Sequence, residues 1–90
     1  MVDRKQAVEI AMAEAENLLG QGSFSLEEIE RDSYKGRDIW SVTLGVPRNM
    51  KLLPPFAQLT ASPVEYKRFL IDVETGELVA MQRHEVASRQ

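Results

Sequence analysis

The sequence predicts a small α+β fold in which one N-terminal helix packs on a three- to four-stranded antiparallel sheet. Three observations support this prediction: an amphipathic helical pattern over 3–19, a strand pattern over 38–46, and two β-prone runs around a glycine-containing turn within 63–86. A hairpin by itself is only marginally stable in water. We therefore expect the helix to cover the apolar side of the sheet.

Composition and charge limit the classes of protein to consider. We expect residues 1–90 to form one domain, with ordinary fractions of hydrophobic (43%) and charged (28%) residues. The net charge of −3 argues against a nucleic-acid-binding surface, and no apolar run approaches the roughly 20 residues of a membrane span. We expect neither nucleic acid nor a membrane as partner. The absence of cysteine and the polar N-terminus predict a cytoplasmic location.

The N-terminal helix has a start signal, an apolar face and a stop signal. Asp3 is the expected N-cap, and Gln6 completes a capping box. Gly20 and Gly22 mark its end. The expected apolar face, widened by Ala7, Ile10 and Ala13, consists of Val8, Ala11, Met12, Ala15, Leu18 and Leu19.

Residues 23–34 fit two interpretations. Ser25 and Glu28 have capping-box spacing, which allows a short helix. The turn-like residues that begin at Lys35 favour a hairpin partner upstream instead. We choose an edge strand over 27–34, where acidic side chains would discourage unwanted strand pairing.

The strand over 38–46 alternates in hydrophobic character. Its helix-facing residues are expected to be Trp40, Val42, Leu44 and Val46, and its outer-face residues Ile39, Ser41, Thr43 and Gly45. Trp40 is the largest expected contributor to the core.

A proline-rich apolar insertion occupies 47–63. Compact domains rarely keep a structureless connection longer than about 12–15 residues, and this one is too apolar for a solvated linker. One interpretation folds it over the outer face of the sheet and buries Phe56 and Leu59 there. The other makes it a contact surface for another protein or for a second copy of the chain. The candidate contact residues are Met50, Leu52, Leu53, Phe56 and Leu59, together with Tyr66 and Leu70 of the following strand.

The C-terminal hairpin is expected to have a three-residue loop at 74–76, with Gly76 in the left-handed conformation. Asp72 and Thr75 fit turn chemistry and require no functional site. The predicted cross-strand pairs are Val73 with Glu77, Ile71 with Val79, Phe69 with Met81, and Lys67 with Arg83. In this register Val79 lies on the apolar face, and Leu78 lies on the other face with Tyr66 and Leu70.

The residue types that carry catalysis are sparse. The single histidine, His84, lies near a strand end, far from Asp72 and Glu74 in the predicted register, so a shared metal site is not expected. No nucleophile elbow or phosphate-binding loop is present. The acidic run formed by Glu27, Glu28, Glu30 and Asp32 is typical of a solvated edge. We expect no catalytic residue, metal or cofactor, and hence no enzyme.

The order of these parts resembles the PepSY domain family. The resemblance is carried by the alanine-rich helix around Ala7 and Ala11, the tryptophan strand at 38–42, and a hydrophobic-Asp-x-x-Thr-Gly-x-hydrophobic segment. In that segment the matching residues are Ile71, Asp72, Thr75, Gly76 and Leu78. The resemblance implies a cystatin-like layout and a role in binding or inhibiting other proteins. The insertion at 47–63 and the missing export signal depart from the family pattern.

A similar order of parts also occurs in small bacterial toxin-immunity proteins, which are acidic and intracellular. Both resemblances imply a non-catalytic binding module with a protein partner. Two alternatives stay open: a structural domain that forms a homodimer through 47–63, and a domain that binds a small ligand beneath that segment.

Overall fold

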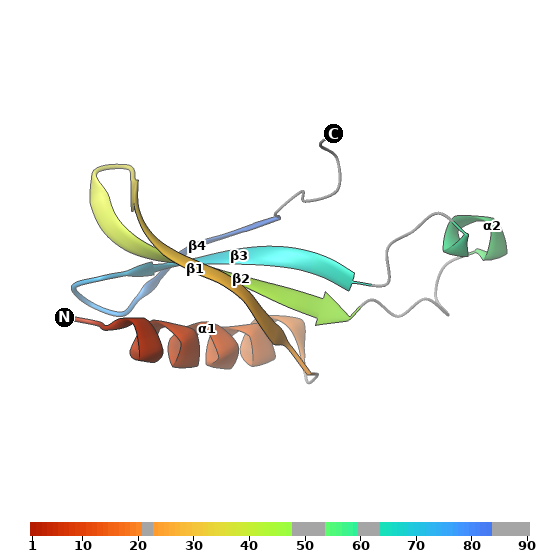
Figure 1. Ribbon diagram of the computed structural model, residues 1–90, viewed down its shortest axis with the longest axis horizontal. Coiled ribbons are helices and arrows are strands. Elements are labelled where there is room, and N and C mark those ends of the chain that lie inside the picture. Colours follow the sequence, from red (N-terminus) through yellow and green to blue (C-terminus); the bar gives the residue numbers. More distant parts are fainter. Residues whose placement is uncertain (21–22, 48–53, 60–63, 84–90) are drawn as a thin grey trace.

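The computed structural model describes residues 1–20, 23–47, 54–59 and 64–83. The elements in order are α1 (Arg4–Leu19), β1 (Ser25–Tyr34), β2 (Arg37–Pro47), α2 (Pro55–Gln58), β3 (Val64–Asp72) and β4 (Leu78–Arg83). The strands form one antiparallel sheet in the order β1-β2-β3-β4. The long helix α1 lies across one face of this sheet, and α2 lies beyond the ends of β2 and β3 (Figure 1). The predicted α+β fold is confirmed.

The ends of α1 follow the predicted signals. The Asp3 carboxylate accepts a hydrogen bond from the Gln6 amide (2.8 Å), and the Gln6 side chain accepts one from the Asp3 amide (3.0 Å). This reciprocal capping box satisfies amides that have no partner within the helix. At the other end Gly20 adopts a positive φ of 84° and donates its N–H to the Glu16 carbonyl (3.0 Å).

Alanines form the line along which α1 approaches the sheet. Ala7, Ala11 and Ala15 are fully buried and are spaced four residues apart, so they lie on one side of the helix. Their small side chains let the helix backbone come close to the strands. The predicted face was too wide, because Ala13 is exposed and Leu18, in the last turn, is 52% exposed.

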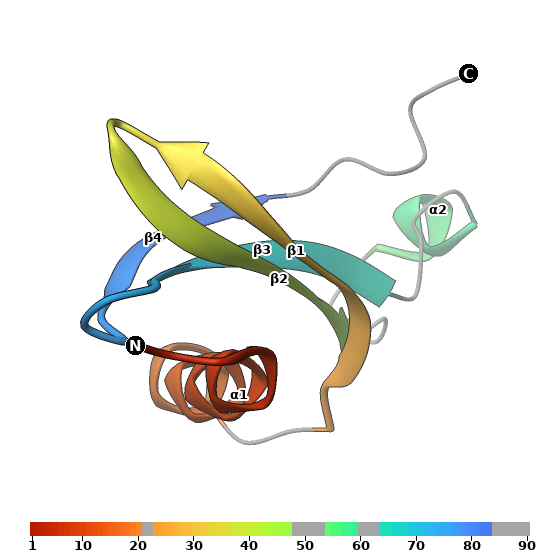
Figure 2. The same cartoon turned by 60° about the vertical axis from the view of Figure 1, so that its left-hand side comes forward.

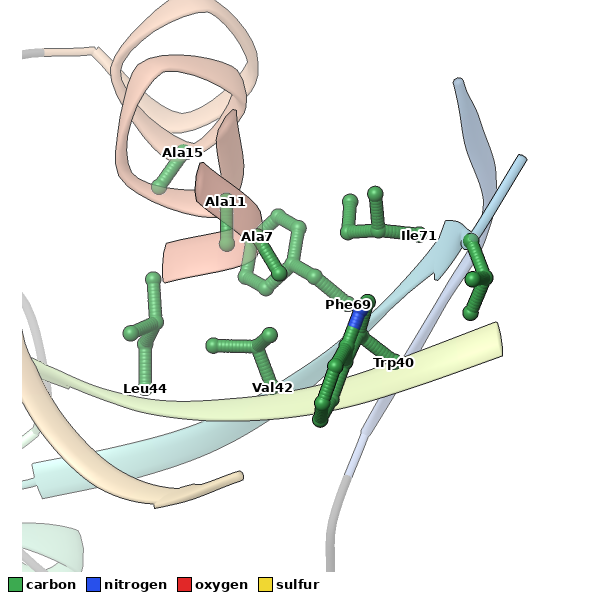
Figure 3. Packing of buried hydrophobic residues seen from close by; sticks show 9 residues of the cluster. Ala7, Ala11, Ala15, Trp40, Val42, Leu44, Phe69 and Ile71 are labelled. Atoms are coloured by element: carbon green, nitrogen blue, oxygen red, sulfur yellow. The ribbon is translucent and has the colours of Figure 1, made fainter. Parts of the chain in front are cut away.

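The core lies between these alanines and the two central strands. The side chains that face α1 there are Trp40, Val42, Leu44, Phe69 and Ile71, as Figure 3 shows. The predicted orientation of Trp40, Val42 and Leu44 is therefore confirmed. Trp40 also donates its indole N–H to the Val2 carbonyl (2.8 Å), which attaches the start of the chain to β2.

The region before β2 is a strand, so the strand interpretation is confirmed and the helix alternative is wrong. Strand β1 begins at Ser25, two residues before the predicted start at 27. It pairs with β2 through a two-residue turn in which Lys35 and Gly36 have positive φ values of 52° and 81°. Two consecutive positive φ values are typical of a tight hairpin turn whose twist matches the strands.

The hairpin of β3 and β4 keeps only part of the predicted register. Phe69 pairs with Met81 as predicted, but Ile71 pairs with Leu78 instead of Val79. The shift arises because Val73 does not pair with Glu77. Instead, the Val73 amide donates to the Asp38 carbonyl (3.1 Å), and Val73 accepts from the Val2 amide (2.7 Å).

The last bonded pair before the turn is therefore Asp72 with Glu77 and not Val73 with Glu77. The Asp72 amide donates to the Glu77 carbonyl (2.9 Å). Val79 becomes the extra residue of a β-bulge. Leu78, which was predicted on the outer face, packs against the core instead.

Candidate protein-contact site

The described part of the insertion carries an exposed apolar pair. Helix α2 starts at Pro55, a position that suits proline because the first helical amide needs no partner. The Leu59 amide donates to the Phe56 carbonyl (3.3 Å), which closes the single turn. Phe56 is 80% exposed and Leu59 is 85% exposed. Their three-residue spacing places both side chains on the same side of the turn.

Helix α2 stands apart from the sheet in both ribbon views (Figures 1 and 2). The interpretation that Phe56 and Leu59 become buried on the outer face is wrong, since both side chains remain mostly in solvent. Ile39 and Leu70 on that face are nevertheless 1% and 4% exposed. Phe56 and Leu59 thus contribute little to the burial of the sheet.

The seven predicted contact residues have different surroundings. Met50, Leu52 and Leu53 lie outside the described residues. Tyr66 is half-buried on β3, opposite Gly45 of β2. Leu70 is buried in the middle of the same strand, where it offers a partner little side-chain area. Among the described candidates, only Phe56 and Leu59 present large apolar surfaces.

Exposure of this size represents a substantial interaction energy. Full burial of a leucine or phenylalanine side chain contributes about 1.5–3 kcal/mol relative to exposure. Single exposed apolar residues are normal on protein surfaces, whereas clustered ones mark contact sites. Phe56 and Leu59 form such a cluster in and directly after an element of only four residues, which cannot be stable as an isolated helix.

Asp72, the most buried carboxylate of the described residues, organises the turn between β3 and β4. Its Oδ1 accepts the amides of Glu74 (2.7 Å) and Thr75 (2.9 Å). Its Oδ2 accepts the Arg37 guanidinium, through Nε at 2.9 Å and Nη2 at 2.6 Å. The Thr75 amide, followed by the Glu74 amide and Arg37, holds the pKa of Asp72 below its ordinary value despite the opposing effect of burial.

This network confirms that Asp72 and Thr75 serve the turn. Thr75 Oγ1 also accepts the Glu77 amide (3.2 Å), and Gly76 has a positive φ of 79°. Sequence reasoning missed Arg37, which reaches Asp72 from the opposite hairpin. The only signal in the sequence was that Arg37 begins a strand that neighbours the strand of Asp72. The positive charge of Arg37 alone could not select Asp72 among the carboxylates.

The remaining candidates for chemistry show no assembled site in the part of the chain that the structure describes. His84 lies outside that part. Glu28, Glu30 and Asp32 are exposed along β1. Within 1–20, 23–47, 54–59 and 64–83, no group of three or more His, Cys, Asp or Glu residues could hold a metal ion. In the same ranges no helix combines the length and hydropathy that crossing a bilayer requires.

The fold defines the class of this protein: a helix-on-sheet α+β domain whose layout is consistent with cystatin-like folds. Comparisons of the chain with protein-family profiles, with curated proteins and with solved structures found no match in any of the three.

Proposed function

We propose that this chain is a non-catalytic module that binds another protein through the segment between β2 and β3. The exposure of Phe56 (80%) on the short helix α2 and of Leu59 (85%) directly after it carries this proposal. The pair would enter an apolar hollow of the partner, since buried aromatic and aliphatic anchors supply most of the binding energy in protein interfaces.

Charge in the sequence suggests the rim of that partner. Arg48 and Lys51 precede α2 in the chain, and 54–59 contains no acidic residue. An acidic rim around an apolar hollow would complement this segment, because complementary charge speeds association and selects the partner.

We further propose that the chain is a divergent PepSY-type domain with a binding or inhibitory role. Two features support this relationship: the layout of one helix on an antiparallel sheet, and the turn that Asp72, Thr75 and Gly76 build together. Because that turn is fully explained by hairpin folding, the binding function is assigned to α2 and not to the turn.

The test compares a double variant, Phe56→Ala with Leu59→Ala, with a matched control, Leu18→Ala. Leu18 is also exposed (52%) but lies on α1. Each tagged protein is used to capture partners from its native extract, with quantitative mass spectrometry as the readout. We expect at least one protein to be retained by wild type and by the control but lost with the double variant.

Two results would contradict the proposal. One is a partner set that does not differ between wild type and the double variant. The other is a wild-type protein that retains nothing. If the retained protein is a second copy of the chain, and the double variant loses it, the homodimer alternative replaces a foreign partner.

A further inference from the structure

We infer that the outer edge of β4, which has no further strand beside it among the described residues, is a second interaction surface that pairs with β4 of another copy of this chain. The inference is separate from the role of α2 and rests on the two edges of the sheet. Strands β1 and β4 are the outer strands, and each has a single strand neighbour within the part of the chain that the structure describes.

The direction of the backbone groups in β4 follows from the turn. The Asp72 amide donates to Glu77, so Asp72 points its polar groups toward β4. N–H and C=O groups of alternate residues in a strand point to the same side, and Leu70 therefore also points toward β4. Its partner Ala80 points back toward β3. The next residue, Met81, consequently directs its N–H and C=O away from the sheet, toward the outer edge.

The side chain of Met81 also lacks full cover. It pairs with Phe69, which is fully buried, yet Met81 itself is 40% exposed. The reason is the position of α1, which packs mainly on β1, β2 and β3. β4 is the last strand in the order of the sheet. A strand added beside β4 would cover Met81 and bond its backbone groups.

The opposite edge is protected against the same event. Glu28, Glu30 and Asp32 of β1 pair with Thr43, Ser41 and Ile39, so all three acids share the outer face. Paired residues in a sheet always lie on the same face. Two-fold antiparallel pairings of β1 centred on residues 29–32 would therefore set acids opposite acids, which is destabilising.

Strand β4 is free of that conflict. A two-fold antiparallel pairing centred on Met81 sets Met81 opposite its own copy, Ala80 opposite Gln82, and Val79 opposite Arg83. No like charges meet in this register. Arg83 additionally has an acidic neighbour in its own protomer, since its Nε lies 3.8 Å from Glu65. A second copy therefore fits this edge, and two four-stranded sheets would become one continuous sheet.

Sedimentation equilibrium tests the inference on the full chain. A contact along one short strand belongs to the small, weak class of interfaces, below about 1,200 Å², so the wild type is measured up to about 1 mM. We expect a reversible monomer–dimer equilibrium. Hydrogen exchange should show protection of the Met81 amide that increases with protein concentration.

Substitutions assign the dimer to β4. Met81→Pro removes the outward N–H without removing a bond to β3, and proline is tolerated at such edge positions. We expect the dimer dissociation constant to rise about tenfold or more. The matched control is Ser33→Pro on β1. Asp38, its partner, points its carbonyl toward Val73, so the Ser33 amide also points to the outer edge, where it donates to the adjacent Asp32 carboxylate (2.7 Å). This control should dimerise like the wild type.

Met81→Lys provides a second variant that keeps the N–H, in case the proline prevents folding. It sets two positive charges opposite each other at the two-fold axis, so we expect dissociation that high salt partly reverses. Met81→Leu should remain dimeric. A wild type that stays monomeric up to about 1 mM would overturn the inference. So would a dimer that survives both Met81→Pro and Met81→Lys, or one that is lost only when Phe56 and Leu59 are replaced.

Discussion

Apolar side chains are buried in one helix of the described residues, α1, and exposed at the other, α2. In α1 the alanines at 7, 11 and 15 are fully buried against the sheet. In α2 and directly after it, the much larger Phe56 and Leu59 remain at least 80% exposed. Side-chain size therefore does not decide burial here; the surface that each helix can reach does. Helix α1 lies along the sheet, whereas α2 stands beyond the ends of β2 and β3 (Figure 1).

The comparison separates a stabilising region from one that is free to bind. Burial of α1 and the central strands supplies the hydrophobic free energy of folding. The exposed Phe56 and Leu59 contribute little to this free energy, so both can be replaced without unfolding the domain. This difference leads to predictions that can be ranked by expected loss of stability.

The largest loss is expected for Trp40→Ala. The side chain is 9% exposed and lies in the core, so its removal leaves a cavity and should lower the free energy of unfolding by about 3–5 kcal/mol. Urea unfolding monitored by circular dichroism measures the change. Trp40→Phe keeps an aromatic ring but loses the bond to the Val2 carbonyl, and should cost less than the alanine. A loss below about 1 kcal/mol for Trp40→Ala, the size of an ordinary substitution, would show that the core does not depend on this ring.

A somewhat smaller loss is expected when the close contact of α1 is enlarged. Ala11→Leu places a larger side chain in a fully buried position, and overpacking typically costs about 1–3 kcal/mol. The matched control is Ala13→Leu on the exposed side of the same helix, which should stay within about 0.5 kcal/mol of wild type. Equal effects of both substitutions in urea melts would mean that the alanine line does not set the distance between helix and sheet.

The sequence predicted what depends on local pattern and missed what depends on distant partners. Capping at Asp3, the orientation of Trp40 and the turn role of Asp72 all arise from residues close in sequence, and all were predictable. The bulge at Val79 was not, because it depends on Val73 bonding to Asp38 and Val2.

The candidate site shows the same limit. Its two described anchors, Phe56 and Leu59, were named from composition alone. Their exposure could not be predicted, because an apolar segment rich in proline has no periodicity that assigns it to a surface or to a core. Leu70 was named as a contact residue for its place on the outer face, yet that face is largely buried in the two central strands.

A third prediction concerns Gly76, which lies in the turn between β3 and β4 and close to Ile10 of α1. Its φ is 79°, and an added Cβ would lie 3.3 Å from Ile10 Cδ1 and from Val2 Cγ2. Because an alanine strains this left-handed backbone, Gly76→Ala should lower the free energy of unfolding by about 1–2 kcal/mol from the backbone alone. Gly36→Ala is an informative control, because φ is also positive there (81°) but no atom lies within 4 Å of the added Cβ. A larger loss at Gly76 than at Gly36 in thermal melts would measure the contact with α1 and Val2.

The Asp72 network predicts a loss of stability in acid. The pKa of this carboxyl is lowered in the folded protein, so its contribution is fully present above the ordinary value of 3.8 and declines as the pH falls through the folded value. Urea midpoints measured from pH 7 downward should decrease in this range. Asp72→Asn should show a shallower decrease than wild type. Parallel pH profiles for the two proteins would mean that other carboxylates cause the acid sensitivity.

The smallest effect on stability is expected for the exposed side chains at α2. Phe56→Ala and Leu59→Ala remove side chains that are 80% and 85% exposed, and surface substitutions of this kind usually change stability by less than about 0.5 kcal/mol. Their free energies of unfolding should therefore match wild type even where partner capture is lost, which separates binding from folding. A loss comparable to that of Trp40→Ala would place these side chains in a structural contact within the protomer. The contrast between α1 and α2 would then disappear, because both helices would stabilise the same fold.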